Sequence, residues 1–268
     1  MQAESDRFRR LKGRRVLICG GSSPVGSAIA QHLAGMGASI SVHFHSHESE
    51  AAAVLRELPL DDGQLHCVLK ADLRVRAEAV QLLQRTEQEL GKGLDLLVNA
   101  AWPTTESRVL EETTPEEINA HLAGVVMHAN VCGAAVPSLR LRQGAVVLVG
   151  GALSRRLFKG FGMNGAAKAA ATTLTQVFAL EEGPNGIRAN VVAPGRVDLQ
   201  DTGTGDGAED ISGESEGLAE LERIARLRRC LPTLPTAADV ASVVGFLALP
   251  ESRQVTGQVF MLTGGEPT

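Results

Sequence analysis

The feature of this sequence that most constrains its fold is a regular alternation of short apolar runs with longer amphipathic segments. Several of the short runs are apolar throughout, which is typical of strands that are covered on both faces. Such alternation predicts parallel strands joined by helical crossovers. Strands are predicted at Arg15–Cys19, Ser39–Phe44, Gln64–Lys70, Leu94–Asn99, Ala145–Val149, Arg188–Val192 and Gln258–Leu262. Helices are predicted at Val25–Met36, Glu48–Arg56, Arg76–Glu89, Pro115–Val136, Gly165–Glu182 and Ala237–Leu247.

The predicted fold class is therefore α/β: a single doubly wound Rossmann domain, with a seven-stranded parallel sheet and helices on both faces. The domain takes in residues 1–268, with residues 1–14 as an N-terminal extension. Residues 200–217 are rich in Gly, Asp, Glu, Ser and Thr, a composition that buries too little apolar surface to hold one shape. We expect residues 200–228 to form a mobile substrate loop and a short helix, either as a lid over the site or as a surface insertion.

Composition and charge exclude several classes of protein. With 26 Lys and Arg against 31 Asp and Glu, the net charge of −5 removes the electrostatic reason to expect nucleic-acid binding. No uninterrupted apolar run approaches the roughly 18 residues of a membrane span. Four widely spaced cysteines favour reduced, mostly buried thiols in a cytoplasmic protein. The chain contains no tyrosine, so any mechanism that needs a phenol is excluded.

A glycine-rich turn joins the first predicted strand to the first predicted helix. Glycines at Gly20, Gly21 and Gly26 let the backbone turn sharply and approach a pyrophosphate, which would then meet the free N–H groups of the helix start. The alternative interpretation is a strand–helix turn that binds no ligand.

The turn resembles the Gly-x3-Gly-x-Gly pattern of the short-chain dehydrogenases/reductases, with Pro24 in place of the middle glycine. The segment Asp95–Ala101 is similar to another motif of that family, although Trp102 stands where a glycine is usual. Further similarities follow in order over almost the whole chain, at Ala71–Leu73, Ile187–Gly195 and Val255–Gly265.

The resemblance implies a nicotinamide dinucleotide cofactor. NADP is favoured over NAD because the end of the second strand, Val42–His47, has no carboxylate to accept from the ribose 2′-OH, although no arginine lies there either. Leu199 stands where a threonine that contacts the cofactor is usual. The implied cofactor-binding residues are Gly20, Ser22, Ser23, Val25, Gly26, His45, Ser46, Asp72, Leu73, Asn99, Ala100, Lys168, Pro194, Gly195 and Val197.

Three histidines at alternate positions, His43, His45 and His47, would share one face of an extended strand. This spacing raises a zinc site as one interpretation. A polar strand end beside the adenosine is favoured over it, and we predict no metal.

The catalytic positions are where the resemblance breaks down. The family uses a tyrosine four residues before a lysine to exchange a proton, a serine to polarise the carbonyl and an asparagine to hold a water relay. Spacing places Lys168 at the lysine, Asn164 at the tyrosine, Gly151 at the serine and His121 at the asparagine. The family's enoyl-reductase variant has its tyrosine seven residues before the lysine, which is Phe161 here.

A carboxamide can donate a hydrogen bond but cannot release a proton near neutral pH, so the usual mechanism is not available to this chain. His121 is one candidate replacement, because histidine titrates near neutral pH, although a buried helix histidine is the alternative. Asn164 and the N–H groups near Gly151 could instead stabilise an enolate. A polar loop after the fifth strand is a further candidate, or else a solvated charged surface: Ser154, Arg155, Arg156 and Lys159.

Three functions remain open. The first is an atypical NAD(P)-dependent oxidoreductase acting on a small carbonyl or enone, and it is placed first because the cofactor-binding motifs persist. The second is a non-redox enzyme on the same scaffold, such as a cyclase, isomerase or dehydratase. The third is a catalytically silent NAD(P)-binding sensor or partner subunit. The family also implies a homodimer or homotetramer formed through the two alanine-rich helices.

Overall fold

The computed structural model describes residues 10–61, 63–199 and 230–265. The predicted loop and short helix at 200–228 lie outside the described residues, as do residues 1–9 of the predicted extension. Within the predicted extension, Leu11 is part of the folded domain: its side chain is buried, and its N–H donates to the carbonyl oxygen of Met36.

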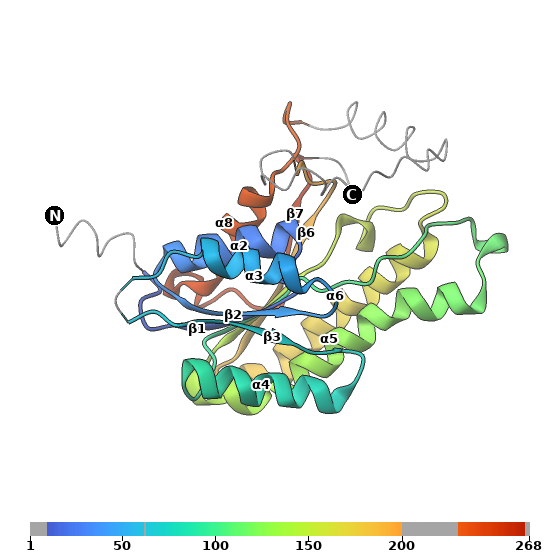
Figure 1. The fold of residues 1–268 in the computed structure, drawn as a ribbon. Helices are drawn as coiled ribbons and strands as arrows, with labels where there is room; N and C mark the ends of the chain where they lie inside the picture. Colours follow the sequence, from blue (N-terminus) through green and yellow to red (C-terminus); the bar gives the residue numbers. More distant parts are fainter. Residues whose placement is uncertain (1–9, 62, 200–229, 266–268) are drawn as a thin grey trace.

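Seven parallel strands form one sheet, in the order β3-β2-β1-β4-β5-β6-β7. Figure 1 shows this sheet in the middle of the molecule, with helices on both sides of it. Every neighbouring pair is parallel, and the order reverses beside β1, as in a doubly wound sheet. The predicted fold is therefore confirmed. The strands are β1 (Arg15–Cys19), β2 (Ser39–Phe44), β3 (His66–Lys70), β4 (Leu96–Asn99), β5 (Ala145–Val149), β6 (Arg188–Pro194) and β7 (Val259–Leu262).

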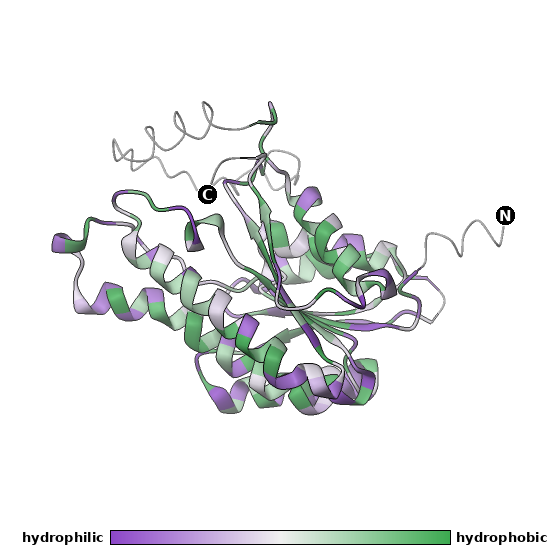
Figure 2. Ribbon diagram, turned by 180° about the vertical axis from the view of Figure 1, so that it is seen from behind, coloured by the Kyte–Doolittle hydropathy of each residue, from purple (hydrophilic) through white to green (hydrophobic). Residues whose placement is uncertain are grey.

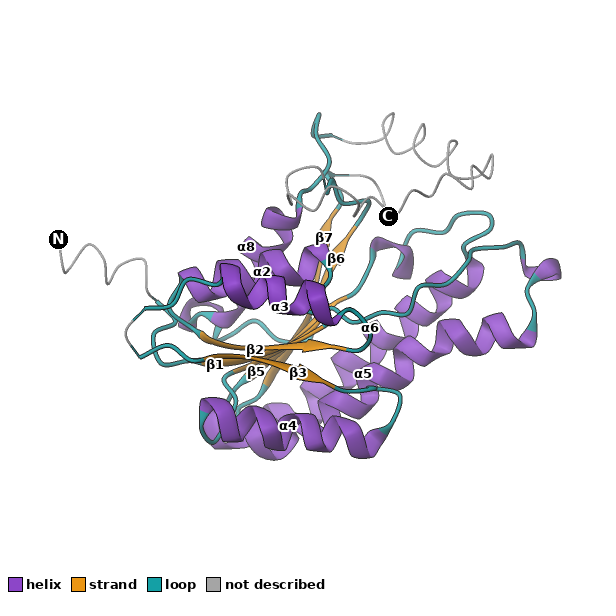
Figure 3. Ribbon diagram, in the orientation of Figure 1, coloured by secondary structure: helices purple, strands orange, loops and turns teal. Residues whose placement is uncertain are grey.

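Helices cover both faces of the sheet (Figure 3). On one face lie α2 (Pro24–Gly35), α3 (Glu48–Glu57) and α8 (Ala237–Ala248). On the other lie α4 (Arg76–Leu90), α5 (Pro115–Arg142) and α6 (Gly162–Glu182). Each face has its own buried core, one around Ile29, Val42 and Val244 and the other around Leu17, Leu82 and Val131. Figure 2 shows the hydrophobic residues of the strands at the centre of the molecule.

Helix α5 is longer than the sequence predicts. It continues through Pro137 to Arg142, so the predicted end at Val136 was wrong. The two extra turns are held by tertiary contacts: Ser138 donates to Glu87 over 2.6 Å, and Arg140 forms an ion pair with Glu182 over 2.7 Å. These contacts offset the hydrogen bond that a proline removes from a helix.

By length and composition alone, α5 would be long and apolar enough to cross a membrane. It packs against α4 and α6, and it buries Val131, Cys132, Ala135 and Leu139. Its apolar composition is therefore that of a core helix. Three of the four cysteines are buried as predicted, while Cys230 is exposed.

Candidate active site

The carboxyl ends of the central strands bring the predicted site residues to one edge of the sheet. Cys19 at the end of β1 pairs with Asn99 at the end of β4, and Asn99 pairs with Leu148 in β5. On the far side, Val149 of β5 pairs with Val192 of β6. Ligands of doubly wound sheets bind beyond this edge, at the point where the strand order reverses.

The glycine turn after β1 is tight in a way that requires glycine. Gly20 has a φ of 74°, and a Cβ atom there would lie 2.8 Å from the backbone of Ala101. A Cβ at Gly26 would lie 2.2 Å from the carbonyl oxygen of Gly20. Pro24 is accommodated because it occupies the start of α2, where its missing N–H costs nothing, and Ser23 caps the helix by accepting from the N–H of Gly26. The turn and helix start have the form of a phosphate-binding site.

His43 holds this turn to the neighbouring strands. The N–H of Gly20 donates to Nδ1 of His43 over 3.2 Å, and Nε2 lies 3.0 Å from the carbonyl oxygen of Ala71. The ring is therefore neutral, with its proton on Nε2. Burial lowers the pKa of His43 to about 4, which keeps the ring neutral above that pH.

The expectation that His43, His45 and His47 share one strand face was wrong. Strand β2 ends at Phe44, and His47 is the N-cap residue directly before α3, which begins at Glu48. Over the described ranges, no three His, Cys, Asp or Glu side chains are grouped so as to hold a metal ion.

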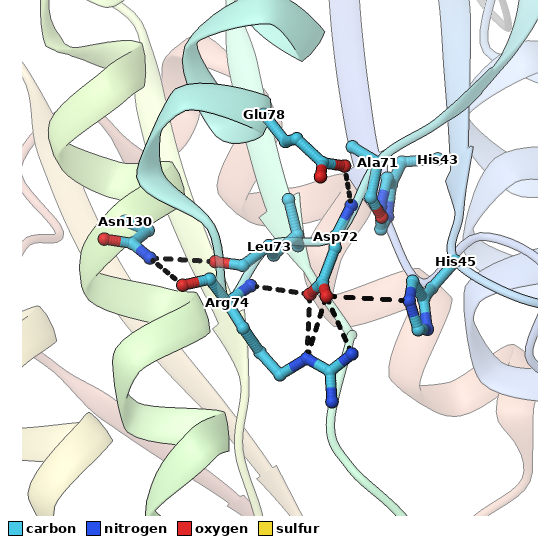
Figure 4. Close-up of polar contacts among 8 residues, drawn as sticks. All are labelled: His43, His45, Ala71, Asp72, Leu73, Arg74, Glu78 and Asn130. Atoms are coloured by element: carbon cyan, nitrogen blue, oxygen red, sulfur yellow. Dashed lines mark hydrogen bonds and ion pairs between the residues drawn. The ribbon is translucent and has the colours of Figure 1, made fainter.

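A charged group lies where the adenosine end of a dinucleotide is expected. Figure 4 shows the carboxylate of Asp72 between the guanidinium of Arg74 and the imidazole of His45. Arg74 donates to both carboxylate oxygens, with a shortest distance of 2.7 Å, and Nε2 of His45 lies 3.8 Å from Oδ2. The hydrogen bonds from Arg74 lower the pKa of Asp72 to about 2. The N–H of Asp72 donates to Glu78 over 2.7 Å, which orients the turn.

Arg74 was not among the site residues predicted from the sequence. No arginine stands at the end of β2, but the pairing of β2 with β3 brings the segment after β3 alongside it. The spacing Asp72-x-Arg74 was the signal that could have found it. Asn130 in α5 holds this segment by donating to the carbonyl oxygens of Leu73 and Arg74.

Asn99 belongs to a buried hydrogen-bond network that links β4 to α5 and α6. Its Oδ1 accepts from the N–H of Ala101 over 3.1 Å, and its Nδ2 lies 3.1 Å from Nδ1 of His128. Nε2 of His128 lies 2.9 Å from Oγ1 of Thr175, which itself donates to Ala171. Burial lowers the pKa of His128 to about 4. His128 was not predicted from the sequence, because it belongs to no recognisable motif.

Lys168 in α6 meets an aromatic ring rather than a carboxylate. Its Nζ lies 3.8 Å from the centroid of the Trp102 ring and donates to the carbonyl oxygen of Gly150 over 3.3 Å. Within the described part of the chain, it forms no ion pair. Burial lowers the pKa of Lys168 to about 7. A lysine with this pKa exchanges its proton readily at neutral pH.

Gly151 and Asn164 lie beside Lys168. A Cβ at Gly151 would be 3.5 Å from Cδ and Cε of Lys168, and Asn164 precedes Lys168 by one turn of α6. Oδ1 of Asn164 is buried without a hydrogen-bond partner among the described residues, and the same holds for Nε1 of Trp102 and Oγ of Ser154. Buried polar atoms without partners are costly, so we expect a water molecule or a ligand to supply hydrogen bonds to these three atoms.

His121 bonds to the loop after β4 rather than to Lys168. Its Nδ1 lies 2.9 Å from Oγ1 of Thr105, and its Nε2 lies 3.0 Å from the carbonyl oxygen of Glu106. Both ring nitrogens are therefore engaged, which favours the structural interpretation of this residue over a proton-donating one. Arg156 is buried, with its guanidinium 4.9 Å from the Phe158 ring centroid.

The remaining predicted cofactor residues lie at the same edge of the sheet. Ala100 donates to Cys19, and Gly195 donates to Leu262. Ser46 is exposed at the end of β2, with Oγ 3.2 Å from Nδ1 of His47. The rest are at least partly buried: Ser22, Ser23, Val25, Leu73, Pro194 and Val197. Their roles in binding stay a prediction.

Comparison with known proteins gives one consistent result. The family model described as enoyl-(acyl carrier protein) reductase matches residues 20–266. The chain is 33% identical to a short-chain dehydrogenase/reductase from Armillaria gallica, over 95% of this chain and 96% of that one. It is 29% identical to a hydroxynaphthalene reductase-like protein from Metarhizium acridum, over 97% of each chain. A short-chain dehydrogenase from Burkholderia cenocepacia, solved in complex with NADP, is similar with a TM-score of 0.81 and 31% identity, over 96% of this chain and 99% of that one.

Proposed function

Because this chain belongs to the short-chain dehydrogenase/reductase superfamily of oxidoreductases, we propose that it transfers a hydride between a nicotinamide cofactor and a small carbonyl or enone substrate without a tyrosine acid. The observation that carries the proposal is the placement of Lys168. It stands at the sheet edge with the dinucleotide-binding turn, while Asn164 occupies the position one helical turn before it.

The residues present fit a nicotinamide dinucleotide. Gly20 and Gly26 allow close approach of a pyrophosphate to the start of α2. Asp72 and Arg74 offer polar groups for the adenosine end, and Lys168 would hold the ribose next to the nicotinamide. The bound cofactor supplies or accepts the hydride. The similar Burkholderia protein was solved with NADP, which supports this fit.

We favour NADP over NAD at this site. The 2′-phosphate of NADP needs cationic or hydrogen-bonding groups where NAD needs a carboxylate. Arg74, His45 and Ser46 supply such groups around the end of β2. Asp72, the nearest carboxylate, is already paired with Arg74, so its charge is largely offset.

The side chains at the catalytic positions set what chemistry is available. Asn164 can polarise a carbonyl by a hydrogen bond, whereas Gly151 offers no hydroxyl. A second candidate, a non-redox isomerase, cyclase or dehydratase, is favoured by the same absence of hydroxyl groups, because an amide can stabilise an enolate without releasing a proton.

The superfamily is generally oligomeric and acts on small molecules. We propose a homodimer or homotetramer formed through α5 and α6. This is supported by apolar side chains that both helices leave exposed: Leu122 and Val126 on α5, and Leu174, Val177 and Leu180 on α6.

The test of the function uses the single tryptophan of the chain, which lies beside Lys168. Titration with NADPH is expected to quench Trp102 emission at micromolar concentrations, and NADH at higher ones. Incubation with NADPH and a panel of ketones and enones is then expected to oxidise the cofactor. A silent binding protein would bind NADPH without oxidising it, and absence of binding at millimolar cofactor would overturn the proposal.

A further inference from the structure

The environment of the Lys168 ammonium differs from what a lysine that only binds ribose requires. The indole of Trp102 covers it at 3.8 Å, and Gly150 is the one hydrogen-bond acceptor it meets in the described chain. An ammonium group has three N–H bonds, so donors remain for a ligand. Position 102 therefore brings a large aromatic ring against the ammonium of Lys168.

On one side of Lys168, the hydroxyl groups that the family uses are missing. Gly151 carries no side chain, and Asn164 is shorter than a tyrosine and leaves its Oδ1 without a partner in the described residues. Neither a serine hydroxyl nor a phenol therefore stands between Lys168 and a substrate oxygen at these two positions.

We propose that the Lys168 ammonium is the proton donor of this enzyme, and that Trp102 is the positioning residue that holds it in place. The inference rests on the proposed reductase function. In reduction, the carbonyl carbon receives a hydride from reduced nicotinamide, and the π electron pair of the carbonyl moves to its oxygen. An N–H bond of Lys168 breaks as the O–H bond of the alcohol forms. The neutral amine then takes a proton from solvent.

Two opposing effects of the indole decide whether this lysine can act as an acid. The ring face attracts the cation, which favours the charged form. The ring also excludes water, which favours the neutral form. Burial acts in this second direction and lowers the pKa of Lys168 from its usual range to about 7. The lysine is thus an acid at the pH where a tyrosine would need strong activation.

Other titratable and charged groups on the surrounding elements must be separated from Lys168 in any test. On α5 these are His121, bonded to Thr105 and Glu106, and His128, bonded to Asn99 and Thr175. The loop that continues from Trp102 carries Glu106 and Arg108, which form an ion pair with each other. After β5, Arg155 and Lys159 are exposed and Arg156 lies against Phe158.

The first experiment measures the protonation of Lys168 as a function of pH, in the absence of cofactor. The chain has one tryptophan and no tyrosine, so emission excited at 295 nm reports on Trp102 alone. We expect a step in that emission as pH passes through about 7, which Lys168→Met abolishes and His121→Gln retains. A wild-type emission that does not change between pH 6 and 9, or a step that survives Lys168→Met, would overturn the inference.

The second experiment separates proton donation from ribose binding. Lys168→Arg keeps a cation that can hold a ribose but cannot release a proton near neutral pH. It is expected to bind NADPH within about tenfold of wild type, measured by Trp102 quenching, while kcat falls at least 100-fold. A variant that binds NADPH and keeps wild-type turnover would sink the inference. If Lys168→Arg does not bind NADPH, the pH dependence of kcat in Trp102→Gly, described next, tests the inference instead.

Replacing the indole by the family's glycine tests the role of Trp102. In Trp102→Gly, water reaches Lys168, so the alkaline limb of the kcat profile for reduction is expected to move up by at least one pH unit. Competitive acylation of Lys168, followed by mass spectrometry, measures the pKa of its amine, and this pKa is expected to rise by the same amount. An alkaline limb that does not move in Trp102→Gly would contradict the assignment of Trp102 as the positioning residue. Failure of wild type to bind NADPH or transfer hydride would instead remove the proposed function itself.

Discussion

The indole ring of Trp102 lies directly against Gly124 in α5, and a Cβ atom at position 124 would come within 2.8 Å of the ring. The two residues are coupled, because the indole can cover Lys168 only while position 124 has no side chain.

Gly124→Ala is therefore expected to displace the indole. Forcing a methyl group into a filled space costs about 1–3 kcal/mol of unfolding free energy. Urea denaturation measures this cost, and a change in Trp102 emission reports the displacement. Gly162→Ala, at a helical glycine with open space around it, is the matched control. Equal stabilities of the two variants would show that the ring does not need this contact.

Arg74→Ala tests the cofactor preference. Loss of a charge-assisted hydrogen bond to a phosphate is expected to weaken NADPH binding about tenfold while NADH binding changes little. Dissociation constants come from Trp102 quenching. Arg85→Ala, an exposed arginine on α4, is the control. A parallel loss for both cofactors would place Arg74 away from the 2′-phosphate.

The double variant Gly151→Ser with Asn164→Tyr is expected to create the usual carbonyl reduction. Position 151 accepts a side chain, because a Cβ there would make ordinary contact with Lys168 at 3.5 Å. We expect NADPH-dependent turnover of simple ketones to rise at least tenfold over wild type. Cofactor binding without any gain on a broad ketone panel would show that the hydroxyl groups do not reach the substrate.

Two buried histidines make stability depend on pH. The pKa values of His43 and His128 are lowered to about 4 in the folded chain, whereas unfolded histidine titrates near 6.5. Between these values the unfolded state binds more protons, so stability falls as pH drops from about 6.5 to 4. The slope contributed by the two groups is at most about 2.7 kcal/mol per pH unit.

Urea unfolding at several pH values measures this slope. His128→Gln should lower this slope by about 1.4 kcal/mol per pH unit, which corresponds to one proton. The glutamine amide does not titrate, but it can still accept from Asn99 and donate to Thr175, so the hydrogen bonds are kept. His47→Gln, at an exposed histidine, is the control. A slope that His128→Gln leaves unchanged would mean that His128 is not buried as a neutral ring.

The order of strands and helices and the parallel sheet could be predicted from the sequence by itself. Hydrophobic periodicity is local, so segments such as Arg15–Cys19 and Ala145–Val149 carry their own signal. Spacing along one helix was equally informative, because residues four apart share a helix face, and this placed Asn164 beside Lys168.

Tertiary structure decided what touches the functional groups. The contact of Trp102 with Lys168 joins the loop after β4 to α6, and the proximity of Arg74 to His45 depends on β2 pairing with β3. Likewise, α5 continues beyond Pro137 because its last turns bond to Glu87 of α4 and Glu182 of α6. Each of these depends on residues far apart in the chain, and the physical reason is that burial and side-chain contacts, unlike periodicity, exist only once the elements are packed together.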